Sequence, residues 1–360
     1  MSDRDTGRMV RAGRRSVLAG TVVAAVLLLA PGAIAAGPLH PQPVESVGPM
    51  STPRESIGSA SPRPATRAAG LVGRVVPTTG GRAVTPSPES RTVEPTPAEE
   101  TGADLRTLNV VAHQDDDLLF MNPAVSDDIA AGRWVVTVFV TAGDAGRGSA
   151  YWRGREQGAM AAYAAMAGVP GKWAADTVNL AGHRIQRRSL AGTRVALLFL
   201  RLADGHGNKA RPSENLRSLW RGQIPTVRPL DSTDRYTRTG LVRTLTSLMD
   251  LLQPDDIRTL DFAGDYGDGD HADHHTVGYF TYKAQRQYLS EHSTSGYLGY
   301  PAEFHPVNLS TEERDRKLAW FMAYAPFDLK VCQRAATCLS NFYAPRFART
   351  VQITDDATIG

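Results

Sequence analysis

A histidine and three consecutive aspartates stand close together in one short segment. The segment reads Ala112-His113-Gln114-Asp115-Asp116-Asp117. Adjacent carboxylates repel one another and lower stability unless positive charge offsets them, and a divalent metal ion is the simplest source of that charge. Because imidazole and carboxylate are both ligands of catalytic zinc, this segment indicates a metal site.

A second group of histidines and aspartates lies far downstream, at residues 264–275 (GDYGDGDHADHH). Taken alone, each segment has a simpler interpretation: capping carboxylates in a turn for the first, and a solvated or calcium-binding loop at Asp268-Gly269-Asp270 for the second. Taken together, they supply a histidine and a carboxylate from one segment and a histidine from the other. Three such ligands leave the fourth position of a zinc ion open for water, so the sequence predicts one catalytic zinc ion.

The runs of apolar residues predict how the fold brings these segments together. Residues 108–112 and 134–141 are nearly continuous and rich in β-branched side chains, which is typical of strands buried on both faces of a parallel sheet. A third strand is expected at 257–262, directly before the second segment. Parallel strands end at the same edge of an open α/β sheet, where sites form, so we expect both segments at that edge.

Helices are expected to alternate with these strands. Apolar residues recur at helical spacing over 151–168, and Gly168 and Pro170 end that helix. Further strands are predicted at 177–180 and 194–202, and further helices at 239–252, 276–289 and 311–324, the last with a capping box at Ser310–Glu313. The pattern predicts a single domain, a Rossmann-like three-layer α/β/α sandwich with a mostly parallel sheet.

The first hundred residues differ in composition from the rest. All 26 aromatic residues lie at or after Phe120, so this part lacks the large apolar surfaces that offset the entropy cost of folding. Residues 1–36 are typical of a signal peptide, with an apolar stretch at 17–30 and small residues before the expected cleavage point. The pair Arg14-Arg15 favours the twin-arginine type, and an uncleaved membrane anchor is the alternative.

Residues 37–104 are predicted to be a disordered linker rich in Pro, Ser and Thr, because 12 of the 23 prolines lie there without any apolar periodicity. The folded domain then spans 105–360. Its two cysteines, Cys332 and Cys338, are spaced for a disulfide, which agrees with export to the cell exterior or the cell wall. A net charge of +3, with no basic block beyond the extreme N-terminus, argues against nucleic-acid binding.

The two metal segments resemble those of the LmbE-like, or PIG-L, family of zinc-dependent N-acetylglucosaminyl deacetylases. The resemblance runs from about residue 105 to 347, and it includes the glycine-containing loop 141–146 and the pair Arg155-Glu156 before an Ala-rich helix. The family usually has proline at the position of Gln114 and glutamate at the position of Asp117. These two departures leave the ligand positions intact.

The resemblance implies zinc held by His113, Asp116 and His274, with His275 as the alternative ligand in the second segment. It also implies that Asp115 is the general base. This division of roles agrees with the chemistry, because two consecutive carboxylates cannot easily bind one ion at full strength, whereas one can ligate while the other accepts a proton from the attacking water.

The resemblance further implies that His271 is a cationic group facing the reacting carbonyl, where it shares the charge of the oxyanion with zinc. Asp273 is expected to orient His271 and to keep it protonated. Arg155 and Asp144 are predicted to contact the substrate, although a helix-surface salt bridge is an alternative for Arg155.

The expected function is therefore removal of the N-acetyl group from an N-acetylglucosamine-containing glycan or glycoconjugate outside the cell. One alternative is a catalytically silent carbohydrate-binding protein of the same fold. Another is a zinc amidase that acts on a different N-acylated natural product.

Overall fold

The structure is a computed structural model that describes residues 104–205 and 214–354. The predicted signal peptide and all but the last residue of the predicted linker lie outside the described residues. All described residues belong to one compact unit. Within these two ranges, no helix has both the length and the apolar character needed to cross a membrane.

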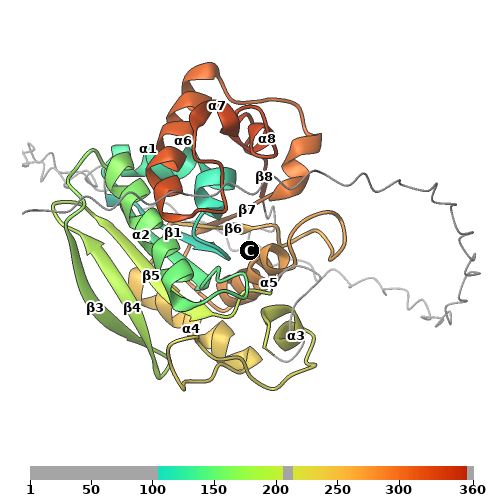
Figure 1. The fold of residues 1–360 in the computed structure, drawn as a ribbon. Coiled ribbons are helices and arrows are strands. Elements are labelled where there is room, and N and C mark those ends of the chain that lie inside the picture. The colour runs from blue at the N-terminus through green and yellow to red at the C-terminus, as the bar shows by residue number, and fades with distance from the viewer. Residues whose placement is uncertain (1–103, 206–213, 355–360) are drawn as a thin grey trace, which may run out of the picture. The chain divides into compact units, whose positions relative to one another are not determined.

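An eight-stranded sheet in the order β3-β4-β5-β2-β1-β6-β7-β8 forms the centre of the domain (Figure 1). The strands are β1 (Arg106–Val111), β2 (Trp134–Thr141), β3 (Trp173–Leu180), β4 (His183–Leu190), β5 (Val195–Leu202), β6 (Asp256–Leu260), β7 (Ser293–Tyr297) and β8 (Gln352–Thr354). The five inner strands, β5 to β7 in this order, pair in parallel, and β3, β4 and β8 add antiparallel edges. This arrangement confirms the mostly parallel sheet.

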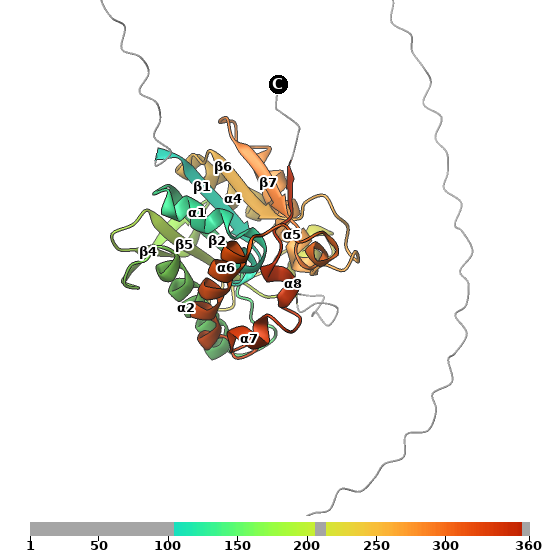
Figure 2. The same ribbon diagram turned by 90° about the horizontal axis from the view of Figure 1, so that it is seen from above.

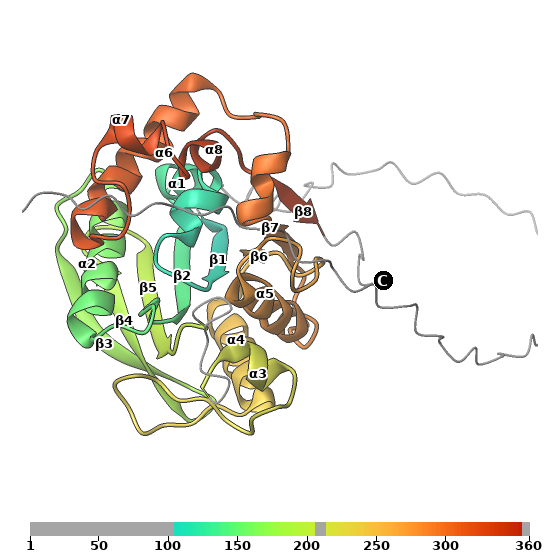
Figure 3. The same ribbon diagram turned by 45° about the vertical axis from the view of Figure 1, so that its right-hand side comes forward.

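Helices cover both faces of the sheet, which confirms the three-layer sandwich (Figures 2 and 3). One face carries α1 (Ala124–Ala130), α2 (Ser149–Met166) and α6 (Thr311–Tyr324), and the other carries α3 (Leu216–Trp220), α4 (Arg238–Leu252) and α5 (Ala272–Gln285). Short helical segments complete the chain: η2 (Asp117–Met121), η4 (Tyr300–Phe304), η5 (Ala325–Phe327), α7 (Ala335–Cys338) and α8 (Ala344–Phe347).

Most predicted elements are confirmed to within a few residues, and β2 and α6 have the predicted bounds. The capping box of α6 is present, since Ser310 Oγ accepts from the backbone of Glu313 and the Glu313 carboxylate accepts from the backbone of Ser310. Helix α5 begins four residues earlier than predicted. Its N-cap is His271, whose Nδ1 accepts from the backbone N–H of Asp273 at 3.1 Å.

The predicted disulfide between Cys332 and Cys338 is present, with a Cα–Cα distance of 5.3 Å. It closes the loop that follows α6 and η5. The side chain of Gln333 ties the same loop together by donating to the backbone carbonyls of Ala325, Asp328 and Val331. This loop therefore holds Asp328 in place beneath the site.

Candidate metal centre and active site

The two predicted metal segments meet at one edge of the sheet. His113, Asp115 and Asp116 follow β1, whereas His271 caps α5 and His274 lies in its first turn. Strands β1 and β6 pair in parallel, so the loops that follow them start side by side. The ring of His113 lies 4.8 Å from that of His271 and 5.4 Å from that of His274, measured between centroids.

The three residues predicted to be zinc ligands are in contact. Asp116 Oδ1 lies 3.1 Å from His274 Nε2 and 3.3 Å from His113 Nδ1, and all three side chains are buried. Burial alone would raise the pKa of Asp116, but the positive charges of His274 and His113 outweigh it and hold that pKa well below its usual value. His275 points elsewhere, toward Asp268 and Asp261, so the geometry favours His274 over His275.

A buried carboxylate orients His274. Asp270 Oδ1 lies 2.8 Å from His274 Nδ1, and the same carboxylate accepts from the backbone N–H groups of Gly299 and Tyr300. Position 299 has no room for a side chain, because a Cβ there would lie 2.3 Å from Asp270 Oδ1. Burial lowers the pKa of His274, but the charges of Asp270 and Asp116 more than reverse this effect and bring the pKa to about 10. The carboxylates of Asp270 and Asp116 thus favour a positive charge at or beside the ring of His274.

The residues fit a divalent metal ion by their donor atoms. His113 Nε2 and His274 Nε2 are buried, and neither has a hydrogen bond of good geometry to the described residues, although Asp116 Oδ1 lies 3.1 Å from His274 Nε2. Ligand atoms of His113, His271 and His274 all lie within 4.8 Å of one another, and the same holds for His113, Asp204, His271 and Asp273. Imidazole nitrogens converge here beside carboxylates, and Asp270 holds the opposite ring nitrogen of His274, so these residues could hold a divalent metal ion.

Asp115 is held by a buried arginine. Arg155 Nη2 donates to Asp115 Oδ1, while its other nitrogens reach Tyr324 Oη at 2.7 Å, the carbonyl of Gly143 at 2.8 Å and Asp328 Oδ2 at 3.0 Å. Burial raises the pKa of Asp115 and the charge of Arg155 opposes this effect, with a net upward shift. A carboxylate with a raised pKa accepts a proton more readily, which suits the predicted base.

The contacts of Arg155 contradict one of the two predictions made for it. Its side chain is buried and binds Asp115, Asp328, Tyr324 and Gly143, so the interaction is not a helix-surface salt bridge, whereas contact with a substrate stays a prediction. The guanidinium can meet the carboxylate because position 143 is a glycine with φ +56°, where a Cβ would lie 2.3 Å from Arg155 Nη1. The structure therefore makes Arg155 a positioning residue for Asp115.

The contacts of Asp273 also differ from those predicted. Its carboxylate accepts from the backbone N–H of Gly205 at 2.6 Å and lies 3.5 Å from His113 Nε2, but 4.0 Å from His271 Nδ1. Asp273 orients His271 through its backbone N–H instead. Burial, followed by the positive charge of His113, lowers the pKa of His271 to about 4. Both this lowered pKa and the accepting Nδ1 favour a neutral His271 with its proton on Nε2 over the predicted cation.

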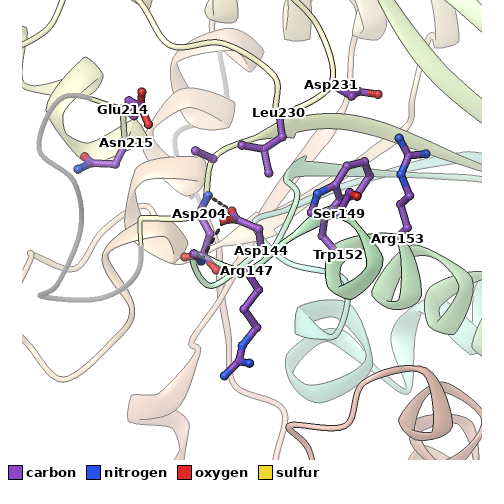
Figure 4. A pocket seen from close by; sticks show the side chains of 12 residues that line it. Asp144, Arg147, Ser149, Trp152, Arg153, Asp204, Glu214, Asn215, Leu230 and Asp231 are labelled. Atoms are coloured by element: carbon purple, nitrogen blue, oxygen red, sulfur yellow. Dashed lines mark hydrogen bonds between the residues drawn. The ribbon is translucent and has the colours of Figure 1, made fainter.

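A cavity of about 450 Å³ opens beside the cluster (Figure 4). The predicted substrate residue Asp144 lies in its wall, where Asp144 Oδ1 accepts from the backbone N–H of Asp204 at 2.9 Å. Asp204 in turn places Oδ2 3.7 Å from His113 Nε2, so it borders both the cavity and the candidate metal centre. The volume lies in the range of small-molecule sites. The wall also includes Arg147, Ser149, Trp152, Arg153, Glu214, Asn215, Leu230 and Asp231.

Three acidic residues of the site were missed in the sequence. Asp204 follows the C-terminal end of β5, so the rule that placed the other residues at this edge could have found it. Asp270 stands four residues before His274, a spacing that could have suggested a partner. No sequence pattern predicts the contact of Asp328 with Arg155, because the two residues meet only when the loop of Asp328 packs against α2.

The protein is thus an α/β sandwich with a histidine–aspartate centre at the carboxyl ends of its strands. Residues 108–285, from β1 to the end of α5, match the sequence model of the family described as PIG-L: GlcNAc-PI de-N-acetylase. This match confirms the resemblance over residues 108–285, and it supports a deacetylase.

Several solved structures match part of the chain. The zinc-inhibited form of the teicoplanin deacetylase Orf2 is 15% identical, covering 70% of this chain and 100% of that chain with a TM-score of 0.39. N,N'-diacetylchitobiose deacetylase from Pyrococcus horikoshii is 15% identical (69% and 78% covered, TM-score 0.38), and the hydratase GalB from Pseudomonas putida KT2440 is 15% identical (61% and 79%, TM-score 0.37). No curated protein sequence matches the chain. Similarity at this level says nothing about the substrate.

Proposed function

We propose that this chain is an exported zinc-dependent N-deacetylase that acts on an N-acetylglucosamine-containing glycan or glycoconjugate. The observation that carries the proposal is the meeting of Asp115, Asp116, His113 and His274 at one edge of the sheet. The adjoining cavity is lined by Asp204, which lies 3.7 Å from His113 Nε2, and it is large enough for a sugar. Export is supported by the sequence of residues 1–36 and by the disulfide.

Zinc held by His113, Asp116 and His274 would supply a Lewis acid that polarises the acetyl carbonyl and acidifies water. Asp115 accepts a proton from the water whose oxygen attacks the carbonyl carbon. His271, with its proton on Nε2, donates a hydrogen bond to the carbonyl oxygen as negative charge develops there. The C–N bond then breaks, and the proton held by Asp115 passes to the leaving nitrogen, so the products are acetate and a free amine.

The test is a joint measurement of bound zinc and of amine release from N-acetylglucosamine and its oligomers. We expect zinc-dependent release of amine and acetate in equal amounts. Asp115→Asn is expected to retain zinc and to lower kcat by about 10²- to 10⁴-fold, because the loss of a positioned base has an effect of this size. A zinc-loaded protein that binds such glycans without releasing amine would overturn the proposal in favour of a silent carbohydrate-binding protein.

Export is tested separately from catalysis. Replacing Arg14 and Arg15 together by lysine is expected to retain the protein in the cytoplasm, because the twin-arginine signal is read as a pair. Immunodetection in cell and culture fractions measures the distribution. Unchanged export of this variant would contradict the twin-arginine assignment.

A further inference from the structure

A second group of ligand-type side chains lies away from the candidate active site. Asp261 follows β6, Asp268 lies in the loop before α5, and His275 lies in the first turn of α5. One ligand atom from each lies within 4.8 Å of the others. His274 points from the same turn of α5 toward Asp116, so adjacent histidines serve two separate clusters.

The two ring nitrogens of His275 both face acceptors. Its side chain is fully buried, with Nδ1 3.3 Å from the backbone carbonyl of Asp261 and Nε2 3.0 Å from Asp268 Oδ1. A carbonyl oxygen only accepts, so Nδ1 carries a proton. Nε2 faces the Asp268 carboxylate at hydrogen-bond distance, so either a proton or a metal cation lies between these two atoms. A metal-bound histidine has this arrangement, with its other ring nitrogen donating to a backbone carbonyl.

The carboxylate of Asp261 supplies a second, independent observation. Asp261 is 3% exposed, and its Oδ1 accepts from the backbone N–H groups of Ala263 and Gly264. Among the described residues, its Oδ2 has no hydrogen-bond donor, and the nearest charged partner is His275 Nδ1 at 3.8 Å. In a residue that is 3% exposed overall, this oxygen receives no donor from the described residues, and a bound cation would be its partner.

Gly264 lets the two carboxylates approach one another. A Cβ at this position would lie 2.4 Å from Asp261 Oδ2, 2.8 Å from Asp268 Oδ2 and 2.9 Å from His275 Cε1. The three side chains therefore converge on the space that any side chain at position 264 would fill. Asp268 is about one-third exposed, so an ion can reach the cluster from solvent.

We propose that Asp261, Asp268 and His275 form a second metal site, specific for a transition-metal cation such as Zn²⁺. One imidazole nitrogen with two carboxylate oxygens suits zinc, whereas calcium and magnesium prefer sites made only of oxygen. Asp268 Oδ1 also accepts from the backbone N–H of Asp270, the residue that orients His274. The second ion thus holds the loop that positions a ligand of the candidate active site.

The experiment counts zinc in the purified full chain after removal of metal and reloading. Asp116→Asn removes a ligand of the first site and Asp268→Asn removes a ligand of the second. We expect about two zinc ions in the unchanged protein, about one in each variant and none in the double variant. Asp265→Asn, a matched change in an exposed residue of the same loop, is expected to keep both ions.

A thermal measurement keeps the proposal testable if Asp268→Asn folds poorly. In the Asp116→Asn background, added zinc is expected to raise Tm, and Gly264→Ala in that background is expected to abolish the rise, because its Cβ fills the site. If the unchanged protein binds one zinc ion and Asp116→Asn binds none, a proton rather than a metal holds this cluster and the proposal is overturned. Counting ions does not depend on whether the protein deacetylates any substrate.

Discussion

Asp270 Oδ1 lies 2.8 Å from Nδ1 of His274, one helical turn further along the chain. The contact fixes the ring so that Nε2 faces Asp116. A histidine ligand held in this way binds its metal more strongly, because the carboxylate sets both its orientation and its basicity. The same carboxylate receives two backbone N–H groups, so its own position is determined by the loop at 299–300.

Asp270→Asn is therefore expected to weaken zinc binding at the candidate active site by about 10- to 100-fold. Competition with a chelator of known affinity measures the change. Asp265→Asn is the matched control, since Asp265 lies in the same loop but is exposed. An unchanged zinc affinity in Asp270→Asn would show that His274 is not a ligand or does not need this partner.

Asp328→Asn is expected to lower kcat by about tenfold while KM and zinc content stay unchanged. Asp328 Oδ2 lies 3.0 Å from Arg155 Nε, and it also accepts from the hydroxyls of Tyr151 and Tyr324, so it fixes the guanidinium that holds Asp115. A misplaced base slows the chemical step without changing substrate binding.

Steady-state kinetics and zinc analysis, carried out well below the Tm of the variant, measure these quantities. Asp176→Asn serves as a control, because Asp176 forms an exposed pair with Arg187 on the edge strands β3 and β4. A rise in KM with unchanged kcat would instead assign the Arg155 network to substrate binding.

The sequence predicted the parts of the fold that depend on local pattern. Strands β1 and β2 are continuous apolar runs because both faces are covered by helices, and such runs are visible without a structure. Strand β4 was missed because it is an antiparallel strand near the edge whose burial is mostly partial and whose sequence includes three arginines. Strand β7 was missed because its sequence, STSGY, has no apolar run although it is buried.

The candidate site was predictable where residue type and position after a parallel strand suffice. It was less predictable where a contact depends on how a loop folds. His113, Asp116 and His274 belong to two segments that each follow a parallel strand, so their meeting follows from the topology. The contacts of Arg155 were not predictable, because they depend on the loop around Asp328, 173 residues later in the chain. The Asp273 carboxylate accepts from the backbone N–H of Gly205, 68 residues earlier in the chain, and no sequence pattern links these two positions.

Loss of the disulfide is expected to lower the free energy of unfolding by about 2 kcal/mol, because it closes a short loop and constrains the unfolded chain only modestly. The double variant Cys332→Ser and Cys338→Ser, compared with the oxidised protein by urea denaturation, measures this effect. Since Gln333 in this loop donates to the carbonyl of Asp328, we expect kcat of the variant to fall as well. Unchanged unfolding together with unchanged kcat would show that backbone contacts alone hold the loop.

Lys317 gives the domain a pH-dependent stability. Its side chain is fully buried in α6, where it donates to the carbonyl of Arg349 and the hydroxyl of Thr350, and burial lowers its pKa to about 7. The unfolded chain, with the ordinary lysine pKa, binds the proton more tightly. Stability is therefore expected to rise as pH increases from about 7 to about 10.5, by a few kcal/mol, and Lys317→Met is expected to lack this rise. Urea denaturation of both proteins across this pH range measures the difference, and parallel curves would contradict a neutral buried Lys317.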